Sequence, residues 1–418
     1  MKEIKIDMPQ AVREIIEVLE GAGFEAFAVG GCVRDAVLGR VPADWDITTS
    51  AMPEEVKALF SRTIDTGIQH GTVTVMKNRV GYEVTTYRID GEYEDARHPK
   101  EVIFTANLVE DLKRRDFTIN AMAYNDRAGI VDEFDGIKDL EEKVIRCVGE
   151  PRERFSEDAL RMLRAVRFAA QLGFSIDEKT KEAIKELAPT LAKVSKERIA
   201  VELIKILVSD HPEEIRTAYE LGLTSVFMPE FDIAMQTVGM HSIVAMQHVQ
   251  AEKRIRLSML LHELGADKTK EILKRLKFDN ATIDFVYRMV NHLDDRPPMD
   301  NMALVRKCIS EIGLENMPMM IEMKRADILA QSDDLFEEKM GYVDGLEHAY
   351  QEVVAKNYCV DKKNLSVNGR DLIEMGMKPG EGMGVVLDML FNEVLRDPTQ
   401  NDREKLLERA NKLITPFI

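Results

Sequence analysis

The sequence predicts an α+β fold in which a mixed sheet with helices, within about the first 145 residues, is followed by an all-helical remainder. In the first part, apolar and polar residues alternate with the two-residue period of a strand, as in residues 71–76 and 82–88. In the second part, apolar residues recur at helical spacing, as in residues 156–172 and 195–208. A chain of 418 residues also exceeds what one hydrophobic core usually organises, so several packed units are expected.

The first elements form a strand, a turn and a helix. The apolar run FEAFAV at 24–29 predicts a strand, the glycine pair at 30–31 a turn, and CVRDAVLG at 32–39 a helix that ends at its glycine. A second strand is predicted over 41–50. The alternating runs on either side of KNRVG at 77–81 predict a hairpin.

Proline and glycine interrupt the helical period of the later chain. These interruptions lie at residues 209–214, 294–300 and 378–384. Together with the change of pattern near residue 146, they predict four segments, which are 1–145, 146–212, 213–330 and 331–418.

The composition is that of an ordinary globular protein, with 45% hydrophobic and 31% charged residues. No apolar run approaches the ~20 residues that a membrane span requires, and the first twenty residues lack the apolar core of a secretory signal. The cytosol is therefore the expected location. Cys32, Cys147, Cys308 and Cys359 lie far apart, which indicates neither a disulfide framework nor a zinc knuckle.

The charge is unevenly distributed. The net charge of −17 argues by itself against a nucleic-acid partner, because phosphate binding depends on Lys and Arg. Residues 146–206, however, hold thirteen Lys or Arg against ten Asp or Glu, a local net charge of +3. This segment could form a basic patch on an acidic protein.

Asp44 and Asp46 are candidate metal ligands. On a strand, the two-residue period points both carboxylates to the same face, where their oxygen atoms suit Mg²⁺. Two such ions can stabilise both the attacking and the leaving oxygen in a phosphoryl transfer. Taken alone, the pair is weak evidence for a metal site and favours a solvated strand end, since Asp is common there.

The glycine turn upstream is a candidate phosphate site. Gly30 and Gly31 allow backbone amides to approach a phosphate closely, and Arg34 follows in the first turn of the predicted helix. A plain glycine turn followed by a surface Arg34/Asp35 charge pair is the simpler interpretation of this motif by itself. A phosphate site followed within seventeen residues by a metal-binding strand is what nucleotidyl transfer requires.

Several longer motifs carry a family resemblance. VGGCVRDAVLGR followed by DWDIT resembles the first motif of class II tRNA nucleotidyltransferases, the CCA-adding enzymes, and of bacterial poly(A) polymerases, in the DNA polymerase beta superfamily. The later family motifs follow in order over residues 24–205, as EVTTYR at 83–88, DLKRRDFTINAMA at 111–123, EDALRMLRAVRFA at 157–169 and SKERIAVEL at 195–203. The resemblance implies a catalytic head (1–145), a base-selecting neck (146–212), and a helical body (213–330) and tail (331–418) that bind tRNA.

The resemblance also implies an activity: template-independent addition of C, C and A to the tRNA 3′ end from CTP and ATP, with Mg²⁺ as cofactor and pyrophosphate as the other product. It implies that Asp44 and Asp46 are catalytic and bind the metal, with Glu83 as a third candidate ligand. The implied nucleotide-binding residues are Gly31, Arg34, Arg115, Asp158, Arg161, Arg164 and Arg167. No membrane and no obligate protein partner are expected.

Asp158 and Arg161 have a physical interpretation of their own. Three residues apart on a predicted helix, they share a face, so a carboxylate acceptor and a guanidinium donor could meet one base edge. An ordinary surface ion pair would explain the same spacing. In the family, the matching pair selects CTP and ATP. Asp116 and Asn120 are expected to hold the head and neck in register rather than to take part in the chemistry.

The charge-rich segment 88–104 is expected to be a loop of the kind that accompanies the switch from CTP to ATP in the family, which favours full CCA or A addition.

Three alternatives to full CCA addition stay open. An enzyme that adds only A and a poly(A) polymerase share most of these motifs. A non-catalytic RNA-binding scaffold is the alternative from another class, although it would not need metal-binding and base-edge groups together.

Histidines in the helical part faintly resemble those of the metal-dependent phosphohydrolase domain that is fused to some relatives. His262, however, is followed by Glu263 where that metal site requires Asp. We therefore expect His241, His248 and His262 to be ordinary helical histidines.

Overall fold

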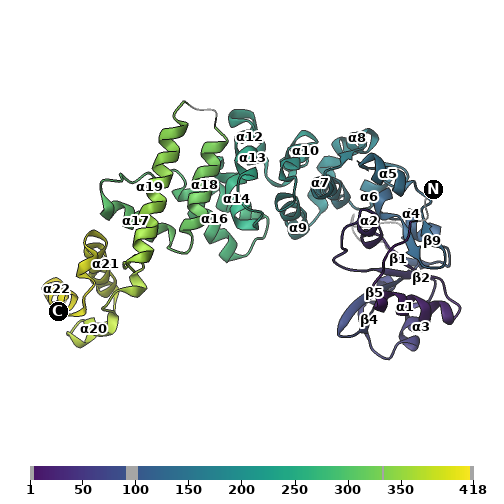
Figure 1. Ribbon diagram of the computed structural model, residues 1–418, viewed down its shortest axis with the longest axis horizontal. Helices are drawn as coiled ribbons and strands as arrows, with labels where there is room; N and C mark the ends of the chain where they lie inside the picture. The colour runs from purple at the N-terminus through teal and green to yellow at the C-terminus, as the bar shows by residue number, and fades with distance from the viewer. Residues whose placement is uncertain (1–3, 91–101, 332–333, 415–418) are drawn as a thin grey trace. The chain divides into compact units, whose positions relative to one another are not determined.

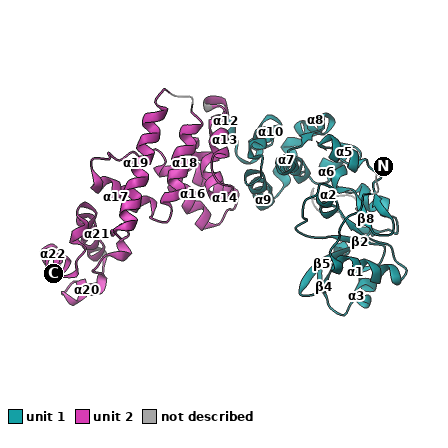
Figure 2. Ribbon diagram, viewed as in Figure 1, with its two compact units in different colours: residues 1–232 teal, residues 233–418 magenta. Residues whose placement is uncertain are grey.

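The computed structural model describes residues 4–90, 102–331 and 334–414. The chain forms two compact units, residues 1–232 and 233–418, which Figure 2 shows in different colours. The first unit contains a mixed sheet and helices, and the second is helical, which confirms the predicted fold class (Figure 1). The division into four segments stays a prediction. None of the helices in the described ranges is long and apolar enough to span a membrane.

A seven-stranded sheet organises the N-terminal part of the first unit. The β2–β5 pair is parallel and the remaining pairs are antiparallel, so the sheet is mixed as predicted. Its strands, in spatial order, are β3 (Thr63–Gly67), β4 (Thr72–Lys77), β5 (Val80–Thr86), β2 (Ile47–Thr49), β1 (Ala26–Val29), β8 (Ala123–Asn125) and β9 (Gly129–Val131).

The predicted hairpin is confirmed as β4 and β5. Lys77 pairs with Val80, so the turn consists of Asn78 and Arg79. Both turn residues have positive φ, 51° and 68°, as a turn that follows the twist of the two strands requires.

The second predicted strand is shorter than expected. Residues 41–50 are predicted to be extended throughout, but only Ile47–Thr49 form β2, and Asp44 and Asp46 lie just before it. One ladder hydrogen bond continues past the strand, from the Val29 amide to the Asp46 carbonyl at 3.0 Å. Pro42 has no amide hydrogen to donate, which is consistent with the late start of the strand.

Helices surround the sheet and make up the rest of the first unit. The predicted helix over 156–172 is interrupted, because α6 ends at Glu157 and α7 begins at Leu160. The helices are α1 (Gln10–Gly21), α2 (Gly31–Val37), α3 (Pro53–Leu59), α4 (Leu108–Lys113), α5 (Gly136–Glu142), α6 (Pro151–Glu157), α7 (Leu160–Leu172), α8 (Glu178–Leu187), α9 (Lys196–Leu207), α10 (Ile215–Glu220) and α11 (Thr224–Phe227), with α12 (Pro229–Val238) at the boundary between the units.

Two short strand pairs lie outside the main sheet. β6 (Arg88–Asp90) pairs with β7 (Val102–Phe104), and β10 (Val144–Ile145) pairs with β11 (Ser175–Ile176). β11 is a small exception to the all-helical prediction beyond residue 146. The middle of the predicted loop, residues 91–101, lies outside the described residues.

The second unit consists of helices packed through apolar faces. Near its C-terminus, residues such as Leu372, Leu390 and Leu406 form one buried cluster. The helices are α13 (His241–Gln247), α14 (Lys253–Leu261), α15 (Ala266–Arg275), α16 (Asn280–His292), α17 (Met302–Ile312), α18 (Met317–Leu329), α19 (Phe336–Ala355), α20 (Gly369–Glu374), α21 (Glu381–Arg396) and α22 (Arg403–Ile414), with the short 3-10 helix η5 (His262–Leu264) after α14.

Candidate active site

The paired carboxylates lie on one side of an extended segment. Asp44 and Asp46 are exposed, whereas Trp45 and Ile47 are buried, so the two-residue alternation holds even outside the strand. Glu83 of β5 precedes Val84, which pairs with Ile47 in the parallel register. Since paired residues of neighbouring strands point to the same side, Glu83 lies beside Asp46 on the exposed side.

The electrostatics of Asp46 indicate a site with an excess of negative charge. Its pKa is raised to about 6, first by partial burial and then by the carboxylates of Asp44 and Glu83, while Arg115 opposes the rise. Oxygen ligands with unneutralised charge suit a hard divalent cation, so this donor set fits Mg²⁺. The part of the chain that the structure describes also contains groups of three possible metal ligands whose ligand atoms all lie within 4.8 Å of one another. Those groups lie in the second unit.

The glycine turn brings Arg115 next to this segment. Gly30 has a φ of 81°, a conformation that favours glycine. A Cβ atom on Gly30 would lie 2.9 Å from Nη1 of Arg115, so the turn leaves room for that guanidinium. The Nε of Arg115 is buried and has no hydrogen-bond partner in the described part of the chain. This side chain therefore keeps hydrogen-bonding capacity for an anionic ligand.

Sequence reasoning missed Asp111, which positions Arg115. Its side chain is fully buried and forms ion pairs with Arg114 at 2.8 Å and Arg115 at 3.4 Å. It also accepts a hydrogen bond from the Thr48 hydroxyl at 3.2 Å, which connects it to β2. The acid in DLKRR lies three and four residues before the arginines, and this helical spacing was a usable signal.

Arg34 is more buried than expected for a residue that contacts a triphosphate. It is 8% exposed, and its Nη1 donates to the Asn120 side-chain oxygen at 2.7 Å. It pairs with Asp35 at 2.8 Å, so the predicted charge pair exists but is largely buried. The guanidinium also lies over the Phe168 ring of α7, 5.0 Å from its centroid. Arg34 thus connects α2 to the helix that follows α6.

Asp116 and Asn120 hold the sheet-containing part against α7, as predicted. Arg164 donates from Nε and Nη2 to one oxygen of Asp116, at 2.8 and 2.6 Å. The other oxygen accepts from the Asn120 amide at 3.1 Å. Arg164 was predicted to face the nucleotide, and this ion pair is the contact that the structure shows for it.

The predicted placement of Asp158 on a helix is wrong. Asp158 has an extended backbone between α6 and α7, and its carboxylate accepts from the Leu160 amide at 3.0 Å. It pairs with Arg198 of α9 at 2.7 Å, whereas Arg161 pairs with Glu157 at 2.5 Å. Asp158 and Arg161 therefore do not form the ion pair that the simpler interpretation expected, and each is held by a different partner.

Arg167 was expected to face the triphosphate or RNA, and the contacts that the structure shows for it are within the protein. Arg167 is 7% exposed and lies 3.2 Å from Glu202 of α9. Burial lowers its pKa to about 10. Together with Arg34 and Arg164, it surrounds the Phe168 ring, at 4.1 Å from the centroid. Its role in this structure is to pack α7 against α9.

Family models match most of the chain. The poly A polymerase head domain matches residues 26–146, the model described as a probable RNA and SrmB-binding site of polymerase A matches 173–235, and the putative tRNA nucleotidyltransferase domain 2 matches 247–410.

Curated relatives match over almost the whole length. The CCA-adding enzymes of Limosilactobacillus reuteri and Lactiplantibacillus plantarum are each 38% identical over 406 residues, which cover 97% and 96% of this chain and 96% and 95% of the relatives. The crystal structure of the Bacillus stearothermophilus CCA-adding enzyme in complex with CTP has a TM-score of 0.79 and 32% identity, and the match covers 96% of both chains. By sequence and by fold, this chain belongs to the CCA-adding enzyme family of nucleotidyltransferases.

Proposed function

We propose that this chain adds C, C and A to the tRNA 3′ end from CTP and ATP, without a template and with release of pyrophosphate. The observation that carries the proposal is the position of Asp44 and Asp46, side by side on the exposed side of the segment before β2 and close to Arg115 and the Gly30 turn. The relatives with this architecture are named CCA-adding enzymes, and one was solved with CTP. The cytosol is the location that we propose for this activity.

Asp44 and Asp46 would hold Mg²⁺, with Glu83 as a third candidate ligand beside them. When bound, the ion would favour deprotonation of the RNA 3′ hydroxyl and neutralise charge on the leaving pyrophosphate. The excess of carboxylates around Asp46 supports this assignment, because a divalent cation would relieve their mutual repulsion.

The protein groups around this site would position the nucleotide. The Gly30 amide donates to the Met122 carbonyl at 3.1 Å, so the turn would offer the Gly31 amide to the phosphates, and the guanidinium of Arg115 would supply positive charge beside it. Asp111 keeps Arg115 in place through its ion pair. No covalent intermediate is needed, because orientation and charge stabilisation account for most of the catalysis of such transfers.

Asp158 and Arg161 would select the base. One supplies an acceptor and the other a donor; Asp158 lies just before α7 and Arg161 in its first turn. Each is already bonded, Asp158 to Arg198 and Arg161 to Glu157, so a bound base would compete with or add to these contacts. Arg164 and Arg167 would support this helix from behind through Asp116 and Glu202.

Primer extension tests the proposal. Purified full-length protein is given Mg²⁺ and a tRNA transcript that ends at the discriminator base, with CTP, ATP or both. We expect addition of the complete triplet with both nucleotides and of the two cytidines with CTP alone. Addition only to transcripts that already end in CC would identify an A-adding enzyme, and long A tails a poly(A) polymerase. Absence of incorporation under all conditions would support the scaffold alternative.

A further inference from the structure

Four metal-binding side chains meet in the second unit, away from the carboxylates before β2. His241 begins α13, His262 and Glu263 lie in η5, and Asp327 lies near the end of α18. The sequence led us to expect ordinary helical histidines here, and it gave no indication that Asp327 is their neighbour. In the structure, the two histidine rings are 5.4 Å apart between centroids, whereas His248 is exposed elsewhere on the surface.

The distances from the two histidine nitrogens to the carboxylate oxygens lie near those between neighbouring ligands of a tetrahedral metal. Nε2 of His241 lies 2.8 Å from Asp327 Oδ1 and 3.6 Å from Glu263 Oε1. Nε2 of His262 lies 3.3 and 3.4 Å from the same two atoms. Bond lengths of about 2.1 Å to a tetrahedral zinc ion place neighbouring ligand atoms roughly 3.4 Å apart. The ligand atoms of both histidines and Glu263 all lie within 4.8 Å of one another.

The hydrogen bonding of His262 favours a metal at this position. Its Nδ1 lies 2.7 Å from the Met259 carbonyl, which can only accept, so Nδ1 carries a hydrogen atom. In a neutral ring, Nε2 then presents a lone pair to the carboxylates. This nitrogen is buried, the side chain is 9% exposed, and Nε2 has no hydrogen-bond partner in the described part of the chain. A ring fixed by an Nδ1–carbonyl bond with a free Nε2 is the arrangement of a metal-ligating histidine.

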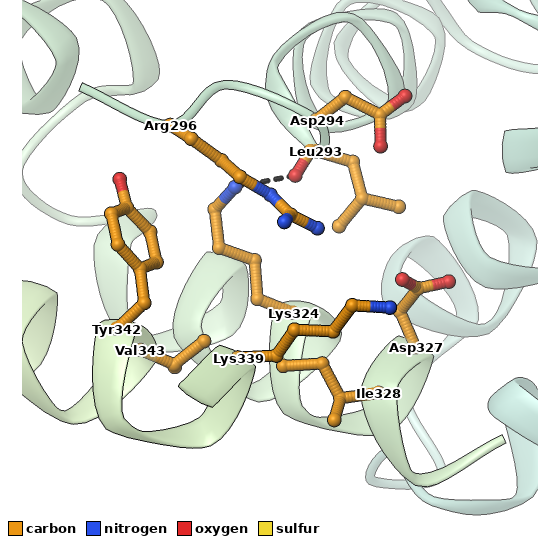
Figure 3. Close-up of a pocket in the computed structure, with 9 residues that line it drawn as sticks. All are labelled: Leu293, Asp294, Arg296, Lys324, Asp327, Ile328, Lys339, Tyr342 and Val343. Carbon is orange, nitrogen blue, oxygen red and sulfur yellow. Dashed lines mark hydrogen bonds between the residues drawn. The ribbon is translucent and has the colours of Figure 1, made fainter. Parts of the chain in front are cut away.

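The acidic ligands are also oriented by neighbours. Oδ2 of Asp327 accepts from the Gln331 amide at 2.8 Å, which leaves Oδ1 directed to the histidines. Asp327 also lines a pocket with Lys324, Lys339 and Arg296, and Figure 3 shows the Lys339 side chain extending toward it. Burial raises the pKa of Asp327, but the hydrogen bonds with His241 and His262 outweigh it and hold this pKa well below its usual range.

We propose that His241, His262, Glu263 and Asp327 bind a zinc ion that joins α13, η5 and α18. Two imidazole nitrogens and two carboxylate oxygens suit zinc, whereas Mg²⁺ and Ca²⁺ prefer oxygen ligands alone. His241, His262 and Glu263 form the compact set of ligands, and Asp327, whose Oδ1 lies 2.8 Å from Nε2 of His241, would move toward Glu263 to complete a closed, structural site.

A proton on Nε2 of His262 would compete with the metal. Burial alone would lower the pKa of His262, but the carboxylates of Asp327 and Glu263 raise it to about 9. Metal binding must displace this proton, so zinc affinity should rise between about pH 7 and pH 9.

Zinc titration of the full-length chain tests the proposal. The protein is stripped with EDTA, exchanged into excess Mg²⁺ to occupy sites that contain only oxygen ligands, and titrated with Zn²⁺ against a chromophoric chelator. We expect roughly one tightly bound equivalent, a rise in the melting temperature, and the visible absorption bands of a tetrahedral site when Co²⁺ replaces zinc.

Variants assign the binding to these residues. His241→Ala and Glu263→Gln should each weaken zinc binding by at least ~10-fold. His292→Ala removes a histidine of the same unit that also contacts a carboxylate, Asp295 at 2.6 Å, and should leave binding unchanged. Glu263 is 28% exposed on its side chain, so its replacement keeps the test valid even where a histidine variant fails to fold. The absence of stoichiometric zinc, or equal binding by the wild type and both variants, would overturn the proposal.

Discussion

Arg164 of α7 donates two hydrogen bonds, at 2.8 and 2.6 Å, to a single oxygen of Asp116, which lies in the segment after α4. Asp116 is 7% exposed, and its other oxygen is occupied by Asn120. A buried carboxylate with charged and neutral donors on both oxygens fixes the position of α7 against the sheet-containing part. Since α7 also carries Arg161, this ion pair sets the position of the proposed base-selecting group.

Asp116→Asn should therefore destabilise the first unit by about 2 kcal/mol, because it removes the charge of the acceptor while Arg164 stays partly buried. Glu186→Gln is a matched control. Glu186 pairs with Arg152, but both side chains are more than half exposed, at 56% and 52%, so the loss should stay below about 0.5 kcal/mol. Urea denaturation of the full-length chain measures the loss of stability in each variant. Equal shifts of the two midpoints would contradict the structural role of Asp116.

The same ion pair predicts a pH dependence. Burial raises the pKa of Asp116, but Arg164 and Asn120 outweigh it and hold this pKa well below its usual range. Because its pKa is lowered in the folded state, the Asp116 carboxylate contributes to the free energy of unfolding. This contribution is complete above the unfolded-state pKa of about 3.9 and is lost as the pH falls through the folded-state value. The stability difference between the wild type and Asp116→Asn should be constant from about pH 7 to pH 5 and shrink below about pH 4. A difference that stays constant to about pH 3 would contradict it.

The sequence could predict what depends on local pattern. The β4–β5 hairpin follows from alternation around a short turn, and the common side of Asp44 and Asp46 follows from the period of an extended backbone. The break at Asp158 was missed because no Gly or Pro marks it. Its carboxylate accepts from the Leu160 amide and competes with the helix locally.

What the sequence could not predict depends on partners far along the chain. Arg167 was expected to bind the nucleotide, but Glu202 of α9 pairs with it inside the protein. Likewise, His241 and His262 become neighbours of Asp327 only through the packing of α13 and α14 with α18. Neither pairing follows a spacing within one helix or strand.

Asp46→Asn should reduce incorporation of both CMP and AMP by about 10³-fold or more, because it removes a proposed ligand of the ion that stabilises the transferring phosphate. Binding of tRNA should change little, since it depends on other surfaces. Asp65→Asn replaces another exposed carboxylate of the same sheet, paired with Lys57 at 2.9 Å, and should retain full activity. Single-turnover extension and a filter-binding assay separate the two effects. A variant of Asp46 that keeps normal rates would refute the metal assignment.

Asp158→Ala should reduce discrimination against UTP and GTP by about 10- to 100-fold, which corresponds to the loss of one hydrogen bond to a charged group. The structure adds a second consequence, because Arg198 loses its 2.7 Å partner and becomes an additional donor near the base. Glu153→Ala, an exposed change on α6, provides the control. The measurement is the ratio of kcat/KM values for each nucleotide on one transcript. Unchanged ratios would remove Asp158 from the base-selecting group.

Gly30→Ala should raise the KM for both nucleotides about tenfold and also lower the melting temperature. Two effects contribute, since the φ of 81° is unfavourable for alanine and the new Cβ would lie 2.9 Å from Nη1 of Arg115. Gly23→Ala separates them. Gly23 has a φ of 91°, but a Cβ there meets nothing within 4 Å, so that variant should lose stability and keep its KM. If both variants kept a normal KM, displacement of Arg115 would not affect nucleotide binding. A raised KM in the Gly30 variant alone would support the role of Arg115 in holding the nucleotide.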